Sequence, residues 1–219
     1  KAAIKSGVAR KTITDWDAYK KSLMELLGQE SKLTRKLHDT ARLHPQRVVF
    51  AEGGHPTMMK AAVQAKTEGI CQPILLGNPD RLNRLAQRLK LDLSDIEIVD
   101  MRADQEQGRR ATYAKHLAKK RARQGYNFEE AYDKMYERNY FGMMMVETGE
   151  ADAFITGLYT KYSNTIKVAK EVVGIRPEYK TFATMHILNT KKGTFYIADT
   201  LINRHPDENV LMDVAKLSA

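Results

Sequence analysis

Disulfide bonds, a secretory leader and membrane spans all lack support in this sequence. Cys71 is the single cysteine among 219 residues, so no disulfide can form within the chain. The longest apolar runs are only a few residues long, far short of the roughly 20 residues that cross a bilayer. The first residues show no basic region followed by an apolar stretch and a small-residue cleavage site. We therefore expect a folded, cytoplasmic protein with no membrane partner.

Motifs for nucleotide binding, hydrolysis and metal binding are missing as well. The sequence has no Gly-x-Gly-x-x-Gly after a strand, no Gly-x-x-x-x-Gly-Lys-Ser/Thr and no Gly-x-Ser-x-Gly. The six histidines are scattered, and no group of His, Cys, Asp and Glu has the spacing of metal ligands. His55 beside Glu52 comes closest, and a polar loop explains that pair better than a metal site. We expect no metal and no bound cofactor in this chain.

Positive charge is in excess, with 36 Lys and Arg against 27 Asp and Glu. Such a balance allows nucleic acid, a membrane surface or a polyanionic small molecule as partner. The densest basic cluster, residues 115–123, lies in a helical pattern and has no nucleic-acid motif beside it. A solvated helix face and an anion site both explain this cluster. We expect no nucleic-acid partner.

Apolar segments alternate with helical segments from Arg47 onward. The apolar segments are predicted to be strands, at residues 48–51, 73–77, 96–100 and 151–156. Helices are predicted at residues 56–68, from 79, and at 105–124, 128–148 and 164–173. Strands separated by helices indicate right-handed β-α-β units. The predicted fold class is α/β, with a mostly parallel sheet flanked by helices.

Residues 1–46 are predicted to form a helical arm with little core of its own. A short amphipathic piece, a capped helix ending at Gly28 and a charged helix ending before Pro45 make up this arm. We expect the arm to connect to another domain or to pack on a neighbour. The predicted division is an arm over residues 1–46 and a domain over residues 47–219.

The last part of the sequence predicts a hairpin and a helix. Strand candidates at residues 181–187 and 194–199 flank a Lys-Lys-Gly turn at residues 191–193. A final helix is predicted to start at Pro206.

One strand end is a candidate anion site. In open parallel sheets, ligands bind outside the carboxyl ends of the strands. Gly157 follows the strand at residues 151–156 and leads to a helix predicted to begin near Ser163 and Thr165. A helix N-terminus presents free N–H groups and a positive dipole, which favour an anion. The alternative is that Gly157 only makes a tight turn.

The segment 140–157 resembles a known family signature. It contains Tyr-Phe-Gly-Met-Met-Met and Gly-Glu-Ala-Asp before Gly157, which is similar to the corresponding motifs of phosphate acetyltransferases (phosphotransacetylases). The stretches Arg47-Val-Val-Phe-Ala-Glu-Gly and Gly193-Thr-Phe-Tyr-Ile-Ala-Asp extend the resemblance. It implies the first of two α/β lobes, because the family's Ser-Thr-Lys-Gly loop and catalytic Asp have no counterpart before Ala219.

The resemblance also suggests ligand-binding residues and one departure from the family. Of two family arginines at the phosphate and coenzyme end of the site, one corresponds to Arg121 and the other is replaced by Lys167. Lysine keeps the charge but loses the planar fork that binds an oxyanion through two hydrogen bonds. Tyrosines 159 and 162 are expected to narrow the cleft. The candidate residues for an anion or acyl-CoA are Arg121, Gly157, Ser163, Thr165 and Lys167.

The arm resembles the end of the catalytic region of large bacterial malic enzymes, which carry a phosphotransacetylase-like domain behind it. This resemblance rests on residues Ala2 to Lys11 and on Asp15-Trp-Asp-Ala-Tyr19. The resemblance implies a fragment of an NADP-dependent, decarboxylating malic enzyme, itself without catalytic residues, that senses acetyl-CoA. NADP and Mg²⁺ or Mn²⁺ are then expected on the upstream catalytic domain, which is the expected partner within a homo-oligomer.

Two other functions stay open at this point. Arg121 and the intact Gly149 to Gly157 segment favour an active phosphate acetyltransferase that transfers acetyl groups between coenzyme A and phosphate. A domain that serves only dimerisation is the third alternative.

Overall fold

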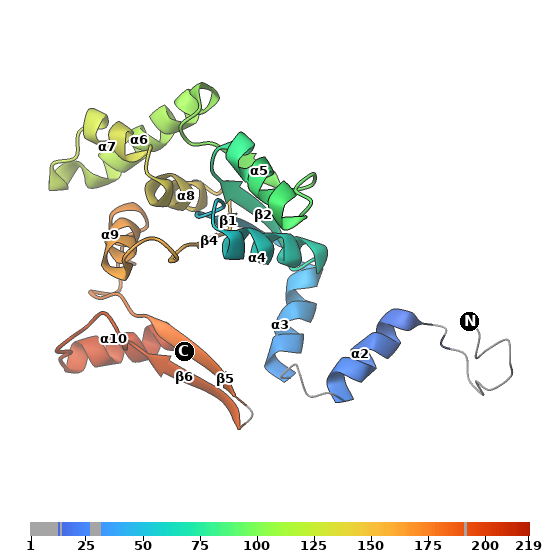
Figure 1. Ribbon diagram of the computed structural model, residues 1–219. Helices are drawn as coiled ribbons and strands as arrows, with labels where there is room; N and C mark the ends of the chain where they lie inside the picture. Colours follow the sequence, from blue (N-terminus) through green and yellow to red (C-terminus); the bar gives the residue numbers. More distant parts are fainter. Residues whose placement is uncertain (1–12, 14, 27–31, 191) are drawn as a thin grey trace, which may run out of the picture.

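The computed structural model describes residues 13, 15–26, 32–190 and 192–219 (Figure 1). The amphipathic piece predicted at the start of the chain, the Gly28 end of the first arm helix and Lys191 of the predicted turn lie outside these residues. Within the described ranges, no helix is both long and apolar enough to cross a bilayer.

Four parallel strands form the central sheet, in the order β3-β2-β1-β4. Their bounds are β1 Gln46–Phe50, β2 Cys71–Leu76, β3 Glu97–Val99 and β4 Ala153–Ile155. From β1 the chain steps outward to β2 and β3 and then crosses back to place β4 on the other side of β1. This order confirms the predicted α/β class. It also puts the point where the strand order reverses between β1 and β4, where ligands of such sheets bind.

Helices cover both faces of this sheet (Figure 1). One face is covered by α4 (Pro56–Thr67) and α5 (Pro79–Leu89). The other face is covered by α6 (Gln107–Arg121), α7 (Phe128–Lys134), α8 (Arg138–Glu147) and α9 (Tyr162–Val172). Short 3-10 turns, η1 (Asp104–Glu106) and η2 (Ala122–Gln124), flank α6.

Successive residues of β1 point into opposite cores. Val48 and Phe50 pack with α4 and α5, whereas Val49 packs with the helices of the other face. In β2, Leu75 joins the first core and Ile74 the second. Because side chains alternate across a strand, burial on both faces requires an uninterrupted apolar run. This is why these strands could be predicted from their composition.

The prediction of one helix over residues 128–148 is wrong. Residues 135–137 turn between α7 and α8, with the Tyr136 N–H donating to the Asp133 carbonyl (3.2 Å) and the Glu137 N–H to the Lys134 carbonyl (2.9 Å). A straight helix of that length would extend roughly 30 Å and leave much of its surface without a partner. The turn instead lets Met135 and Phe141 both be fully buried.

The Arg47 side chain joins the start of β1 to the start of β4. Its guanidinium binds the Asp152 carboxylate, with Nη2 2.8 Å from Oδ1, and the Arg47 N–H donates to Asp152 Oδ2 at 2.8 Å. The Asp152 N–H donates in return to the Arg47 carbonyl at 2.8 Å. The hydrogen bond from the Arg47 side chain is the main cause that lowers the pKa of Asp152 to about 2. The Gly-Glu-Ala-Asp signature thus includes the residue that sets the β1–β4 register.

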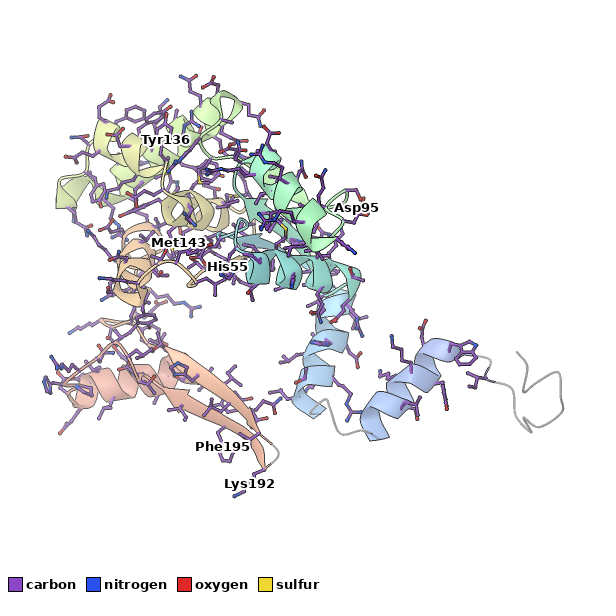
Figure 2. All side chains as sticks on the ribbon, in the orientation of Figure 1. His55, Asp95, Tyr136, Met143, Lys192 and Phe195 are labelled. Atoms are coloured by element: carbon purple, nitrogen blue, oxygen red, sulfur yellow. The ribbon has the colours of Figure 1, made fainter. Side chains whose placement is uncertain are left out.

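The arm and the C-terminal hairpin lie away from the central sheet (Figure 1). The arm helices are α2 (Trp16–Leu26) and α3 (Lys32–Leu43), and the Arg42 Nε on α3 donates to the Glu68 carbonyl after α4 at 2.8 Å. The hairpin and last helix are β5 (Met185–Thr190), β6 (Gly193–Ala198) and α10 (Glu208–Ser218). The antiparallel pair was predicted, although β5 begins four residues later than expected. Figure 2 places Phe195 near the hairpin tip, far from Met143 in the core.

Close packing of α8 on the sheet requires glycine at position 142. A Cβ atom there would lie 2.4 Å from Phe154 Cε2 and 3.1 Å from Leu76 Cδ1. Gly108 in α6 is a matched contrast, because nothing lies within 4 Å of its Cβ position.

We expect Gly142→Ala to lower the free energy of unfolding and Gly108→Ala to raise it. Alanine favours a helix over glycine by about 1 kcal/mol, but overpacking of the core at position 142 costs about 1–3 kcal/mol. Urea denaturation of the two variants measures the difference. Equal stabilisation of both variants would show that α8 does not pack on β4 as closely as described.

Candidate functional site

The carboxyl ends of all four strands open into one cleft of about 830 Å³. Its lining includes Glu52 after β1, Asn78 after β2, Arg102 after β3 and Tyr159 after β4. Small-molecule sites typically enclose about 300–1,000 Å³ and lie at this edge of α/β sheets. The cleft therefore has the place and size of a small-molecule site.

Glu52 joins the ends of β1 and β4 across the floor of this cleft. Its side chain is 1% exposed. Oε2 accepts hydrogen bonds from the Gly157 N–H (3.1 Å) and the Leu158 N–H (2.8 Å), and Oε1 accepts one from the Tyr159 N–H (2.7 Å). We call these contacts the Glu52 clamp. Three consecutive N–H groups aimed at one carboxylate form a backbone anion site, and the protein's own side chain occupies it.

The clamp holds the Glu52 carboxylate in its charged form. Burial raises the pKa of Glu52, but the N–H groups of residues 157–159, together with the positive charge of Arg138, lower it more. The net result is a pKa below the ordinary value, so Glu52 is ionised at neutral pH. The Gly157 N–H, which we predicted for an external anion, thus serves a carboxylate of the same chain.

The loop after the clamp brings aromatic side chains to the cleft. The Tyr159 ring lies edge-on to the His55 ring with centroids 5.1 Å apart, and the Arg138 guanidinium lies 5.8 Å from the Tyr159 centroid. Tyr159 lines the cleft, as expected, whereas Tyr162 does not. His55 caps α4, its Nδ1 accepting from the Thr57 N–H at 3.1 Å.

The N-terminus of α9 begins at Tyr162, two residues earlier than predicted. Ser163 is exposed, and the buried Thr165 hydroxyl makes no hydrogen bond with the described residues. Lys167 pairs with Glu171 one turn further along the helix, with Nζ and Oε1 3.9 Å apart.

Arg121 lies at the opposite end of α9. Its Nε donates to the Glu171 carbonyl at 2.6 Å, and its Nη2 donates to the Lys170 carbonyl. The Glu171 carboxylate accepts hydrogen bonds from the Tyr126 and Tyr140 hydroxyls. Arg121 and Lys167 thus both interact with the C-terminal half of α9.

The structure does not bring the predicted site residues together in the cleft. Gly157 and Ser163 lie before and at the start of α9, while Arg121 lies at its end. None of Arg121, Gly157, Ser163, Thr165 and Lys167 is among the residues that line the cleft. Their role in ligand binding stays a prediction.

Four arginines that were not among the predicted site residues line the cleft, namely Arg81, Arg84, Arg102 and Arg138. Arg81 and Arg84 lie in the first turns of the helix that follows β2, and Arg102 lies three residues after β3. The signal was present in the sequence, because each of these three follows a predicted strand end within a few residues. Arg138 begins α8, where a continuous helix was predicted.

The described residues contain neither a metal-ligand cluster nor a dinucleotide-binding glycine motif. Within those ranges, no group of three or more His, Cys, Asp or Glu side chains is placed to hold a metal. The glycines after β1 and β4 do not form the dinucleotide fingerprint, and α9, which follows the clamp, has no glycine in its first turn.

Comparison with known proteins decides the family. The family model described as phosphate acetyl/butaryl transferase matches residues 32–219. The chain belongs to this family. Phosphate acetyltransferase from Thermoanaerobacterium thermosaccharolyticum is 28% identical over 85% of the chain, which spans 57% of that relative.

Other relatives match the whole chain. NADP-dependent malic enzymes from Salmonella typhimurium and Escherichia coli are 33% and 32% identical over 100% of the chain, which spans only 29% of their length. A phosphotransacetylase structure from Streptococcus pyogenes has a TM-score of 0.72 at 24% identity and covers 85% of this chain, which corresponds to 56% of that structure. At this identity the structural likeness establishes the fold alone.

Replacing Glu52 with glutamine tests the clamp. The amide keeps one acceptor oxygen but turns an NH₂ donor toward N–H groups that the carboxylate had bound. We therefore expect the free energy of unfolding to fall by about 3 kcal/mol. Urea denaturation at neutral pH measures this loss. Glu97→Gln, on the exposed edge strand β3, is the control and should change stability by less than about 0.5 kcal/mol.

The stability of the wild-type protein should depend on pH differently from that of Glu52→Gln. Because the pKa of Glu52 in the folded protein lies below its ordinary value of 4.5, the ionised clamp stabilises the fold above that pH. The stabilisation is lost as the pH falls through the folded-state pKa. The wild-type protein should therefore lose stability more steeply than Glu52→Gln below about pH 5. Parallel pH curves, or a Glu52→Gln variant as stable as Glu97→Gln, would contradict the clamp.

Proposed function

We propose that this chain is a regulatory, phosphotransacetylase-like part of an NADP-dependent malic enzyme, and that it binds acetyl-CoA without transferring acetyl groups. The parent enzyme would oxidatively decarboxylate malate to pyruvate. Support for the parent comes from malic enzymes that match the whole chain at 33% and 32% identity.

The observation that carries the regulatory role is the position of Arg121 and Lys167. Acetyl transfer between coenzyme A and phosphate needs positively charged groups aimed at the reacting oxyanion. Here Arg121 donates to the carbonyls of Lys170 and Glu171, and Lys167 pairs with the Glu171 carboxylate. Neither side chain lines the cleft. This arrangement favours a role without acetyl transfer, because neither cation is aimed at a reacting oxyanion in the cleft.

The volume and the charged lining of the cleft favour an anionic small molecule as the effector. Its volume of about 830 Å³ suits a ligand of the size of a coenzyme A thioester. The four arginines in its lining supply donors that match phosphate oxygens. NADP and the divalent metal would bind to the upstream catalytic domain, which the proposal makes the partner of this chain in a cytoplasmic homo-oligomer.

An active phosphate acetyltransferase remains the alternative. It is favoured by the relatives that carry this name and by the intact segment from Gly149 to Gly157. In that case Arg121 would have to leave the α9 carbonyls when substrate binds.

The test uses the full-length product of the gene. We expect malate-dependent NADP reduction whose rate changes when acetyl-CoA is added, and no acetyl-CoA formation from acetyl phosphate and coenzyme A above the blank. A control protein that ends before Arg47 should keep malate oxidation and lose the response. Acetyl transfer by the full-length protein, or a malate oxidation rate indifferent to acetyl-CoA, would overturn the proposal. A control protein that loses only its assembly would instead support a domain for dimerisation.

A further inference from the structure

One wall of the cleft presents guanidinium groups without carboxylate partners. Arg81, Arg84 and Arg102 line this wall. In the part of the chain that the structure describes, no ion pair joins any of them to a carboxylate. Arg47 and Arg109, outside the cleft, each have such a partner. The donors of the three cleft arginines are therefore available to a ligand.

The charge of the cleft as a whole does not decide the ligand. Its lining contains four arginines and four carboxylates, which belong to Glu52, Asp80, Asp100 and Glu137. Glu52 and Asp100 use their oxygens in hydrogen bonds to N–H groups of the protein. Two of the four carboxylates are thus satisfied internally, whereas the guanidinium groups of Arg81, Arg84 and Arg102 have no ion pair among the described residues.

A hydrogen-bonded frame holds the backbone of Arg81 and Arg102. The Asn78 Oδ1 accepts from the Arg81 N–H at 3.2 Å, which caps α5, and the Asn78 Nδ2 donates to Asp100 Oδ2 at 3.1 Å. The Asp100 Oδ1 accepts from the Arg102 N–H at 3.1 Å. The start of α5 and the turn after β3 are thereby tied together through two side chains. The frame fixes where the two arginines emerge.

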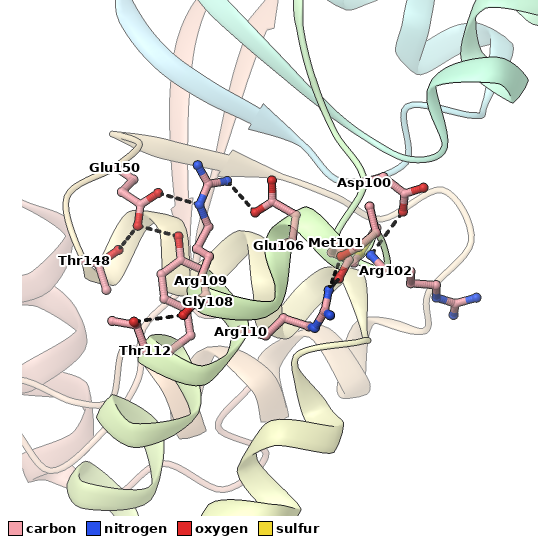
Figure 3. Close-up of polar contacts among 12 residues, drawn as sticks. Asp100, Met101, Arg102, Glu106, Gly108, Arg109, Arg110, Thr112, Thr148 and Glu150 are labelled. Atoms are coloured by element: carbon pink, nitrogen blue, oxygen red, sulfur yellow. Dashed lines mark hydrogen bonds and ion pairs between the residues drawn. The ribbon is translucent and has the colours of Figure 1, made fainter.

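Arg110 fixes the same turn from behind. It is 3% exposed, and its Nη1 donates to the carbonyls of Met101 and Ala103 at 2.7 Å each. These two carbonyls belong to the residues on either side of Arg102. The Arg102 side chain extends away from the Arg110 guanidinium that binds them (Figure 3). The Arg110 guanidinium also lies 4.6 Å from the centroid of Tyr136, which lines the cleft. A buried cation thus supports the arginine wall.

The free guanidinium groups indicate which anion the wall would bind. A single small anion could use the backbone N–H groups after β4, but the Glu52 clamp fills them. Planar guanidinium forks match phosphate oxygens through paired hydrogen bonds. Three such groups favour a ligand part with at least two negative charges, and the cleft volume lies in the range of small-molecule sites.

We infer that Arg81, Arg84 and Arg102 bind the diphosphate group of a small-molecule ligand. The inference deepens the proposed function by naming the part of the ligand that is recognised and its place. The inference rests on the proposed function in one respect only, which is the identity of the ligand as a coenzyme A thioester.

Isothermal titration calorimetry of the 219-residue chain tests this site with three ligands: coenzyme A, inorganic pyrophosphate and pantetheine. Pantetheine has the thiol arm of coenzyme A but lacks its phosphates. Coenzyme A and pyrophosphate should bind, and pantetheine should bind far more weakly. Arg84→Gln and Arg102→Gln should each weaken coenzyme A and pyrophosphate binding by about tenfold, the effect of losing one charge-assisted contact. Arg88→Gln is the matched control, because Arg88 lies on the same helix outside the cleft, and should change binding by less than about twofold.

Each of the other outcomes overturns the inference. The inference fails if neither coenzyme A nor pyrophosphate binds to the wild-type chain, or if both cleft variants keep the wild-type affinity. It also fails if Arg88→Gln loses as much affinity as the cleft variants, or if pantetheine binds as tightly as coenzyme A. Far-UV circular dichroism of the variants establishes that each is folded. The proposed function fails separately: acetyl-CoA without effect on malate oxidation sinks it even if pyrophosphate binds at these arginines. A response to acetyl-CoA that survives Arg84→Gln and Arg102→Gln sinks only the arginine site.

Discussion

A buried carboxylate that binds three consecutive N–H groups is the constraint on which the rest of this structure depends. Glu52 closes the crevice between β1 and β4, where an open parallel sheet would otherwise offer its backbone to an anion. The clamp positions Tyr159 at the cleft and sends the chain on toward α9. Because Glu52 fills the backbone anion site of residues 157–159, the proposed phosphate recognition rests on side chains. The arginines after β2 and β3 line the cleft and have no carboxylate partner among the described residues.

Much of the fold could be predicted from the sequence because the strands are buried on both faces. Val48, Val49 and Phe50 point to different cores but are all apolar, so the run is visible without knowledge of its partners. The break between α7 and α8 could not be predicted. Neither glycine nor proline marks residues 135–137, and the turn follows from packing Met135 and Phe141 into one core.

The contacts of the candidate site residues could not be predicted from the sequence, for two physical reasons. Sequence spacing placed Arg121 on a helix but could not tell that its guanidinium would bind the α9 carbonyls. The partners of Glu52 lie about a hundred residues further along the chain, so no local pattern connects them. The Gly157 N–H donates to the Glu52 carboxylate of the same chain, and a role of Gly157 in ligand binding stays a prediction. The resemblance to phosphotransacetylases predicted the family, whereas the cleft arginines, although three of them follow predicted strand ends, were recognised only when the structure placed them in one cleft.

A crystal structure of the chain with coenzyme A tests the central claim most directly. We expect the diphosphate of the ligand against Arg84 and Arg102, with the Glu52 carboxylate still bound to the N–H groups of residues 157–159. A phosphate on those N–H groups with Glu52 displaced would contradict the account. So would a ligand bound at Arg121 and Lys167 with the arginine wall left empty.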